Sequence, residues 1–399
     1  MVWYYYIALA LILSQLLFVI QTYRNYRYAL KKYKKDRSGY QPRTVLIIPC
    51  KGWDLDFPKN ITSFFNLDYE NYLLWFVVAD ESDPAYDELC KLKDQLTQNS
   101  KAQDVQIFVA GKGQTCSQKI HNLLYCYERI GDDVEIMAFA DSDICINSDW
   151  LSHIVYPLRQ AKNGVASGYR WFIPKKNNPA SLALSALNAK VAQLLGNTHF
   201  NQAWGGSMAI RLDVFRRLGL DKLWPNALSD DLSLSYAVKK AGMKVAFVPA
   251  CLVASYESTT WGRLFEFCRR QFLITRVSAP AAWWFGLFSS LYSVLGLWGT
   301  AGLAVYAAGI AENLLLLTAV PILFFAGQAS RAILRQRMIS KLLEKDFPKM
   351  KAACAADIFL FWVWSLLLLL FIVSSAFGRT IQWRGIRYKL YGPFAVHRV

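Results

Sequence analysis

Four long apolar runs divide the chain, and each is long enough to cross a lipid bilayer. They cover residues 3–20, 281–311, 313–330 and 358–378, and the second and third are parted only by Glu312. A helix rises about 1.5 Å per residue, so about 20 apolar residues span the hydrocarbon layer. The pattern predicts an N-terminal transmembrane anchor over residues 1–23 and three transmembrane or re-entrant helices over residues 281–378.

The first run could instead be a secretory signal peptide. It lacks a basic beginning and a cleavage site of small residues, both of which a signal peptide requires. We therefore expect an uncleaved anchor.

Residues 40–256, between the first two runs, alternate short apolar stretches with helical patterns. The apolar stretches cover 44–50, 73–79, 105–110 and 135–140, and helical patterns at 84–98 and 116–130 lie between them. Short stretches of this kind are typical of strands buried on both faces. The alternation predicts an α/β domain with a Rossmann-like, mostly parallel sheet, whose ligands bind at the carboxyl ends of the strands.

Two later segments also have a helical period. Residues 179–195 are apolar with one charge, Lys190, and form either a helix in the membrane interface or a core helix of the domain. Residues 257–280 mix aromatic and basic side chains, which predicts an amphipathic interfacial helix. Residues 379–399 form a basic C-terminal tail.

The net charge of +16 is concentrated beside the apolar runs. Arg24, Arg27, Lys31, Lys32, Lys34, Lys35 and Arg37 follow the first run, and Arg331, Arg335, Arg337, Lys341, Lys345, Lys349 and Lys351 precede the last. Basic segments next to spans favour the cytoplasmic side and contact with anionic headgroups, rather than nucleic acid. We expect a multi-pass integral membrane protein with its catalytic domain on the cytoplasmic face and its amino terminus outside.

Four spans would place the C-terminal tail outside as well. That side conflicts with the tail's positive charge, which comes from Arg379, Arg384, Arg387 and Lys389. We therefore expect one of the apolar runs to be re-entrant or interfacial.

The cysteines argue against a structural metal. None of the eight forms a C-x-x-C pair, and no histidine lies at metal-ligand spacing from them. Free cysteines in apolar stretches fit a reducing compartment, which agrees with a cytoplasmic domain.

Carboxylates follow two of the predicted strands. Asp141 and Asp143 could hold a divalent cation, because hard cations take oxygen ligands and bridge to substrate phosphates. Asp80 could accept hydrogen bonds from a nucleoside, while Asp83 caps the next helix. Lys119, near the start of a helix, would face the same crevice or be an ordinary surface lysine.

Asp231 is the strongest candidate for a catalytic base. Ser229 or Asp230 suffices to cap the helix that follows, which leaves Asp231 for chemistry and gives Asp230 the capping role. Two adjacent carboxylates oppose each other's ionisation, so we expect a raised carboxyl pKa here.

Arg270 and Gln271, shortly before the second apolar run, form a basic cluster that donates hydrogen bonds. A guanidinium binds phosphate with two parallel hydrogen bonds, so a diphosphate is a natural ligand. The general preference for positive charge beside a span is the alternative.

Six short motifs occur in order along the chain. They are Pro49-Cys50-Lys51-Gly52, Asn66-Leu67-Asp68-Tyr69, Asp80-Glu81-Ser82-Asp83-Pro84-Ala85, Lys119-Ile120-His121-Asn122-Leu123, Trp204-Gly205-Gly206-Ser207-Met208 and Thr380-Ile381-Gln382-Trp383-Arg384-Gly385-Ile386-Arg387-Tyr388. Together they resemble the ceramide glucosyltransferase family, which comprises membrane-bound glycosyltransferases of the GT-A fold and includes bacterial relatives.

The resemblance implies a role for each site residue. Asp141 and Asp143 would hold Mn²⁺ or Mg²⁺, and Asp231 would be the catalytic base. The donor UDP-glucose would be bound by Pro49, Lys51, Asp80, Lys119, Asp141, Arg270 and Gln271. The acceptor would be a lipid of the ceramide, diacylglycerol or hopanoid type.

The chain departs from the family at Gln271. The family motif continues with an arginine and a tryptophan, but here Phe272, Leu273, Ile274 and Thr275 follow. Processive polysaccharide synthases rely on that tryptophan, so its absence argues against chain elongation. It also leaves unassigned which arginine meets the diphosphate.

These observations predict an inverting membrane glycosyltransferase that moves glucose from UDP-glucose to a lipid hydroxyl. A processive polysaccharide synthase is the nearest alternative, but it would need more spans to form a channel. A membrane scaffold or transporter is the other, and transporters carry polar or charged groups within their spans, which are almost absent here.

Overall fold

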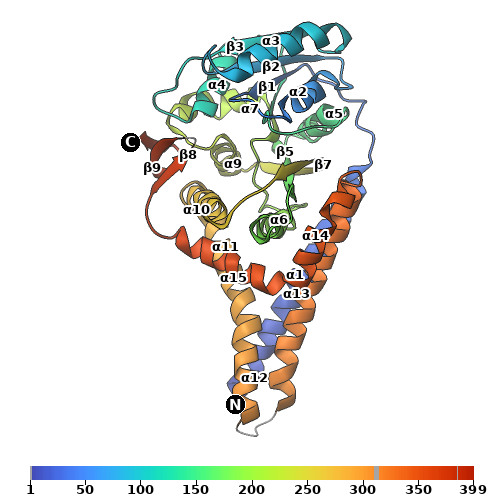
Figure 1. Cartoon of the computed structure of the whole chain (residues 1–399), viewed down its shortest axis with the longest axis vertical. Helices are drawn as coiled ribbons and strands as arrows, with labels where there is room; N and C mark the ends of the chain where they lie inside the picture. The colour runs from blue at the N-terminus through green and yellow to red at the C-terminus, as the bar shows by residue number, and fades with distance from the viewer. Residues whose placement is uncertain (1, 310–313, 384) are drawn as a thin grey trace.

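A computed structural model describes residues 2–309, 314–383 and 385–399. Glu312, at the junction of the second and third apolar runs, and Arg384 of the tail motif lie outside the described residues. An α/β domain stands at one end, and apolar helices extend from it as a bundle (Figure 1).

The domain is built on a seven-stranded sheet in the order β3-β2-β1-β4-β6-β5-β7. The strands are β1 (Thr44–Pro49), β2 (Tyr72–Val78), β3 (Asp104–Val109), β4 (Ile136–Ala140), β5 (Asn163–Pro174), β6 (Ser207–Arg211) and β7 (Lys244–Glu257). Only β6 runs against its neighbours β4 and β5, and the other pairs are parallel. The prediction of a mostly parallel sheet with helices is confirmed.

Alternating side chains of the strands fill two separate cores. Leu46 and Ile48 pack with α2 (Phe57–Phe65), α3 (Pro84–Leu96) and α5 (Trp150–Val155) on one face. Val45 and Ile47 pack with α4 (Gln118–Tyr127), α7 (Leu212–Arg217) and α9 (Asp230–Lys240) on the other. Both faces of the sheet are therefore covered, as the continuous apolar stretches require.

Side-chain caps fix where the helices around the site begin. Asp83 accepts a hydrogen bond from Ala85 N (3.0 Å) and caps α3, as predicted. Ser117 caps α4 through Ile120 N, and Ser229 caps α9 through Leu232 N. Each cap satisfies an otherwise unpaired amide at the helix start, so the loops before these helices have defined ends.

Three helices in the described part of the chain are long and apolar enough to cross a membrane. They are α1 (Val2–Tyr33), the pair α11 (Pro280–Val294) and α12 (Thr300–Gly309), which a π-helical turn joins, and α13 (Leu314–Leu342). Hydrogen bonds tie them together, from Tyr292 Oη to Leu11 O (2.7 Å) and from Gln328 Nε2 to Ser293 O (3.0 Å). The first three predicted runs thus correspond to the three candidate spans.

The fourth run, expected over 358–378, is not a straight helix. It is divided between α14 (Lys351–Phe359) and α15 (Phe361–Ser374), and the chain bends by 83° where they meet. Figure 1 shows α15 crossing the domain end of the bundle. The bend agrees with the expectation that one run is re-entrant or interfacial.

A buried ion pair holds this bent segment in place. The guanidinium of Arg335 in α13 donates to both carboxylate oxygens of Asp357 in α14, at 2.6 and 2.5 Å, and to Gln193 Oε1 at 3.2 Å. The segment before Gln193 is α6 (Pro179–Ala192), which is buried against β5 and α14. That burial agrees with the core-helix alternative for residues 179–195.

The basic tail forms a sheet that the sequence patterns did not predict. Its antiparallel strands are β8 (Thr380–Trp383), β9 (Ile386–Gly392) and β10 (Ala395–Arg398). Tyr388 and Leu390 pack against α10 (Trp261–Ser278), and Arg398 Nη1 donates to Gly113 O (2.8 Å). The tail therefore lies on the same side of the bundle as the α/β domain (Figure 1).

Candidate active site

Lys119 lies at the centre of a cluster of carboxylates at the edge of the sheet. Its Nζ is 2.7 Å from Asp141 Oδ1, 3.0 Å from Asp230 Oδ2 and 3.1 Å from Gly205 O. The Ser117 cap starts α4 so that Lys119 falls in its first turn, facing the end of β4. The side chain is only 17% exposed, so the surface-lysine alternative is wrong.

Burial and charge act in opposite directions on Lys119. Burial by itself lowers the pKa of Lys119, but the carboxylates of Asp141 and Asp230 raise it above its ordinary value. The ammonium group therefore stays charged at physiological pH and holds the two carboxylates together.

Asp230 was expected to cap α9, and that expectation is wrong. Ser229 is the cap, while the Asp230 side chain is buried and directed at Lys119. Burial, together with the smaller effect of the Asp231 carboxylate, raises the pKa of Asp230 to about 6, although Lys119 lowers it. The raised carboxyl pKa expected of this acidic pair thus belongs to Asp230.

Asp231 is fixed by the backbone around it. Its Oδ2 accepts a hydrogen bond from Gly205 N (2.9 Å), and its Oδ1 accepts from Leu232 N (2.7 Å) and from the hydroxyl of Ser229. These bonds join the start of α9 to the loop before β6. The carboxylate is consequently held in one orientation beside the cluster.

The two glycines of that loop allow this close approach. A Cβ at Gly205 would lie 2.5 Å from Asp230 Oδ2 and 2.7 Å from Lys119 Nζ. A Cβ at Gly206 would lie 2.3 Å from the Trp204 ring and 2.7 Å from Asp141 Oδ2. The Trp204-Gly205-Gly206 motif is therefore required by packing against the charged cluster.

Asp80 lies in a more open part of the same edge, just after β2. Its Oδ1 accepts from Ser82 N (3.0 Å) and Ser82 Oγ (2.8 Å), and Lys112 Nζ is 3.8 Å from its Oδ2. These hydrogen bonds, and then Lys112, lower the pKa of Asp80. Asp80 is therefore a charged acceptor that a ligand can reach.

The loop after β1 is tied to the Asp80 segment. Asp83 Oδ1, besides capping α3, accepts a hydrogen bond from Gly52 N (2.8 Å). Pro49 ends β1, and Lys51 is exposed within the loop. The structure thus brings the first and third motifs together.

Asp141 and Asp143 offer hard oxygen ligands on the turn after β4. Asp141 is half-buried beside Lys119, and Asp143 is exposed. Among the residues that the structure describes, no three His, Cys, Asp or Glu side chains converge as a complete metal site. The pair suits a cation such as Mg²⁺, which uses one or two carboxylates and completes its shell with water and phosphate oxygens.

The arginines of α10 differ in their contacts. Arg269 Nη2 donates to Phe377 O (3.0 Å), and Arg276 donates to the carbonyls of Ala376 and Gly378. Arg270 lies over the ring of Phe267 instead, with its Cζ 5.7 Å from the ring centroid. Gln271 is exposed on α10.

Arg170 of β5 was missed in the sequence. Its Cζ lies 5.8 Å from the Phe267 ring centroid and 5.4 Å from that of Trp204, in the loop that holds Asp231. Arg170 and Arg270 therefore approach the same aromatic ring from two elements. An arginine inside an otherwise apolar stretch was the signal that could have identified it.

The start of α9 also contacts the helix that leads into the apolar bundle. Leu228 and Leu232, on either side of the acidic pair, pack in one cluster with Leu273 and Ile274 of α10. Because α11 begins just after α10 ends, this contact lies about two helical turns before the start of the apolar helices.

Comparison with known proteins gives one match over nearly the whole chain. The model of glycosyl transferase family 21 matches residues 7–392.

Two solved structures show a more distant likeness. The mannosyltransferase PcManGT from Pyrobaculum calidifontis, in complex with GDP-Man and Mn²⁺, is 14% identical, with 92% of this chain and 97% of that chain covered and a TM-score of 0.46. GalNAc-T7 with UDP, GalNAc and Mn²⁺ is 13% identical, with 59% and 51% covered and a TM-score of 0.39. Likenesses this distant do not identify the donor or the acceptor of this chain.

Proposed function

We propose that this chain, which belongs to glycosyl transferase family 21, transfers glucose from UDP-glucose to the hydroxyl group of a membrane lipid. Membership confirms the resemblance to the ceramide glucosyltransferase family and makes the chain a glycosyltransferase, not a scaffold or transporter. The position of Asp231 is the observation that supports a lipid as the acceptor. It is fixed at the start of α9, which packs on the helix that continues into the apolar bundle.

Asp231 is proposed as the base of a single displacement. It takes the proton from the acceptor hydroxyl while that oxygen attacks the anomeric carbon of the sugar. The bond from that carbon to the diphosphate breaks on the opposite face, so UDP leaves and the configuration inverts. Each carboxylate oxygen has two lone pairs, so Oδ2 can accept from both Gly205 N and the acceptor hydroxyl.

The open part of the site is proposed to bind the nucleotide. Asp80 is charged and accessible, and its hydrogen bonds with Ser82 hold it in place to accept from the uridine. Pro49 ends β1, and Lys51 lies in the loop that Asp83 ties to this segment, where it would contribute a positive charge near the phosphates.

Asp141 and Asp143 are proposed to hold Mn²⁺ or Mg²⁺. Asp141 and Asp230 pair with the ammonium group of Lys119, and Asp143 and Asp231 are their close neighbours in the sequence, so carboxylates outnumber this cation and a divalent cation would balance the excess negative charge. Such a cation would neutralise the leaving diphosphate when bound. Lys119 keeps Asp141 oriented through their ion pair.

Arg270 and Gln271 are proposed to contact the diphosphate from α10. Arg270 is proposed because it approaches the Phe267 ring together with Arg170, which also lies over Trp204 in the loop that holds Asp231. The absent tryptophan supports one transfer per acceptor rather than chain elongation.

The topology is proposed to follow from three spans. The amino terminus would be outside, and the catalytic domain, the basic residues 24–37 and the tail sheet would all be cytoplasmic. The bend at α14 and α15 supports this arrangement, because a re-entrant or interfacial run removes the conflict over the basic tail. Labelling of single cysteines in residues 31–37 from outside intact cells would contradict it.

The reaction is tested by mass spectrometry of lipids after incubation with purified full-length protein. UDP-[¹³C]glucose is offered with ceramide, diacylglycerol or a hopanoid alcohol, and UDP-galactose and GDP-mannose serve as alternative donors. We expect one labelled hexose on one class of lipid and none with the Asp231→Asn variant. A ladder of hexoses would indicate a polysaccharide synthase, and UDP release without any lipid product would reject the lipid acceptor.

A further inference from the structure

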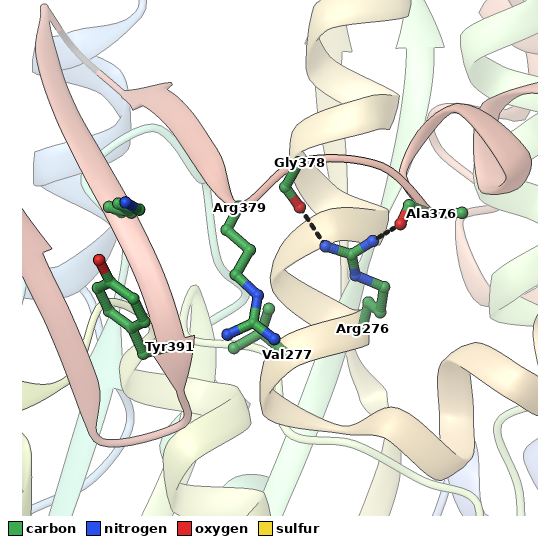
Figure 2. Close-up of a pocket in the computed structure, with 7 residues that line it drawn as sticks. Arg276, Val277, Ala376, Gly378, Arg379 and Tyr391 are labelled. Atoms are coloured by element: carbon green, nitrogen blue, oxygen red, sulfur yellow. Dashed lines mark hydrogen bonds between the residues drawn. The ribbon is translucent and has the colours of Figure 1, made fainter.

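A cavity of about 730 Å³ lies between the end of α10, the turn at residues 376–379 and strand β9 (Figure 2). Its polar lining includes Arg276, Arg379, Lys389 and Tyr391. We propose that this pocket, which is separate from the charged cluster at Lys119, binds the phosphate-bearing headgroup of an anionic phospholipid. The proposal goes beyond the transfer reaction, because this lipid is neither the donor nor the acceptor.

The charged side chains that line the pocket are all positive. Three cationic side chains line it, and none of the described residues in its lining is acidic. Burial lowers the pKa of Arg276, and the nearby Arg379 and Arg269 lower it further. An anion would relieve this crowding of like charges.

The three cationic side chains of the pocket make different contacts. Arg276 donates to the carbonyls of Ala376 and Gly378 and so fixes one wall of the pocket (Figure 2). Arg379 extends between β9 and α10 in the same view, and in the described part of the chain its guanidinium has no hydrogen-bond or ion-pair partner. Lys389 Nζ lies 5.4 Å from the centroid of the Tyr391 ring, and it makes no hydrogen bond or ion pair with the residues that the structure describes. Arg379 and Lys389 therefore remain able to bind phosphate oxygens.

The position of the pocket favours a lipid over a soluble anion. Arg276 lies one helical turn, about 6 Å along the axis, before Pro280, where the second candidate span begins. Phe377, in the turn that forms the wall, is 71% exposed. An exposed apolar ring beside cationic groups at the end of a span can enter the boundary between the headgroups and the acyl chains. Anionic headgroups concentrate at this depth, where each basic residue gains attraction from them.

The pocket is mechanically connected to the candidate active site. Lys389 and Tyr391 alternate along β9 with Tyr388 and Leu390, whose side chains pack in the cluster that contains Leu228. One face of β9 would thus contact the lipid while the other supports the start of α9. We expect a bound headgroup to hold the tail sheet against α9 and stabilise the folded protein.

The pocket is tested by thermal unfolding of full-length protein in a non-ionic detergent, without donor or acceptor. The probes are dihexanoyl phosphatidylglycerol, dihexanoyl phosphatidylcholine and inorganic phosphate at equal concentrations. A ligand that binds only the folded state raises the unfolding temperature as its concentration rises. We expect a saturable rise with phosphatidylglycerol and none with the other two.

Matched variants assign the effect to the pocket. Arg379→Ala with Lys389→Ala should shift the half-saturating concentration by at least about tenfold, as loss of a charge-assisted contact requires. Arg379→Lys with Lys389→Arg keeps the charges and should retain binding. Lys34→Ala with Lys35→Ala removes the same charge from another exposed, membrane-adjacent segment and should behave as the wild type.

Three results would overturn the proposal. An unchanged response in the Arg379→Ala, Lys389→Ala protein would place the lipid elsewhere, and an equal response to inorganic phosphate would make the ligand a soluble anion. Displacement of phosphatidylglycerol by UDP would assign the pocket to the donor. Because no sugar transfer is measured, failure of the proposed reaction would leave this experiment unaffected.

Discussion

Asp80 and Asp230 stand at the same edge of the sheet in opposite environments. The Asp80 side chain is 45% exposed, and the hydrogen bonds from Ser82 lower its pKa. The Asp230 side chain is 6% exposed, and burial raises its pKa to about 6 although Lys119 is adjacent. One part of the site is open and suited to exchanging a ligand, whereas the other is closed and already assembled.

The lysine partners repeat the contrast. Lys112 is 81% exposed and 3.8 Å from Asp80, while Lys119 is 17% exposed and makes two shorter ion pairs. Solvent screens the first pair, and burial leaves the second poorly screened. An ion pair between lysine and aspartate should therefore contribute little to the stability of the fold at Asp80 and much at Asp230.

The largest expected effect is on the rate of sugar transfer, and it comes from the exposed Asp143, a proposed ligand of the metal ion. Asp143→Ala should reduce sugar transfer by at least about 1,000-fold, equivalent to about 4 kcal/mol, because it removes a proposed metal ligand. Initial rates with added Mn²⁺ or Mg²⁺ measure the loss, and the free energy of unfolding should hardly change because Asp143 is exposed. Full activity of the wild type in excess chelator would contradict the metal role.

In the closed part, the effect should appear in stability. Lys119→Met keeps the length of the side chain but leaves Asp141 and Asp230 without their buried partner. Breaking a buried pair in this way costs about 3–5 kcal/mol of unfolding free energy. Chemical denaturation in detergent measures it, and a cost below about 1 kcal/mol would mean that solvent reaches the cluster.

Asp231→Asn should keep the size of the side chain and remove the proposed base, with the loss of one of the two hydrogen bonds from Gly205 N and Leu232 N, because the amide nitrogen cannot accept. The amide cannot accept the proton, so we expect transfer to fall by at least about 100-fold while UDP binding is retained. Asp230→Asn should cost less, because Asp230 contacts Lys119 rather than the acceptor. If Asp231→Asn kept near wild-type activity and Asp230→Asn were inactive, the base would be Asp230.

Sequence patterns predicted the first half of the domain better than the second. The strands at 44–50, 73–79, 105–110 and 135–140 are continuous apolar stretches, and all four form within one residue of those bounds. Strands β5 and β7 were missed because Gly164 and Gly168 interrupt one and Pro249 the other, which weakens a periodic signal. The tail sheet was missed because its residues alternate over few positions and pack on α10, a contact that no local pattern reveals.

The candidate site also contains residues whose roles the sequence predicted and residues whose roles it did not. Asp83 was predicted as a cap from local spacing alone, and the structure confirms it. Asp230 was assigned wrongly because its partner, Lys119, is distant in the sequence, and burial of a carboxylate depends on the fold. Local chemistry was therefore predictable here, and the identity of the buried ion pair was not.

The dependence of stability on pH should expose Asp230 directly. Its pKa in the folded state is raised above the ordinary value, so its contribution to stability is present at low pH and lost as pH rises through about 6. Relative to Asp230→Asn, the wild type should lose about 1 kcal/mol of unfolding free energy between pH 5 and pH 7.5. Denaturation curves of both proteins across this range measure the difference. The same pH dependence in both proteins over this range would mean that Lys119, not burial, controls this carboxyl, because a lowered pKa leaves it ionised throughout.

The smallest effect is expected at Lys112, and it completes the comparison with Lys119. Lys112→Met makes the same chemical change to a lysine that also faces an aspartate, but this pair is exposed and 3.8 Å long. Exposed pairs contribute about 0–1 kcal/mol, since water already solvates both ions. The unfolding free energy should therefore change by less than about 1 kcal/mol. Asp80 should also remain ionised in the variant, because the hydrogen bonds from Ser82 outweigh Lys112 in lowering its pKa. If Lys112→Met destabilised the protein as much as Lys119→Met, burial would not be what separates the two parts of the site.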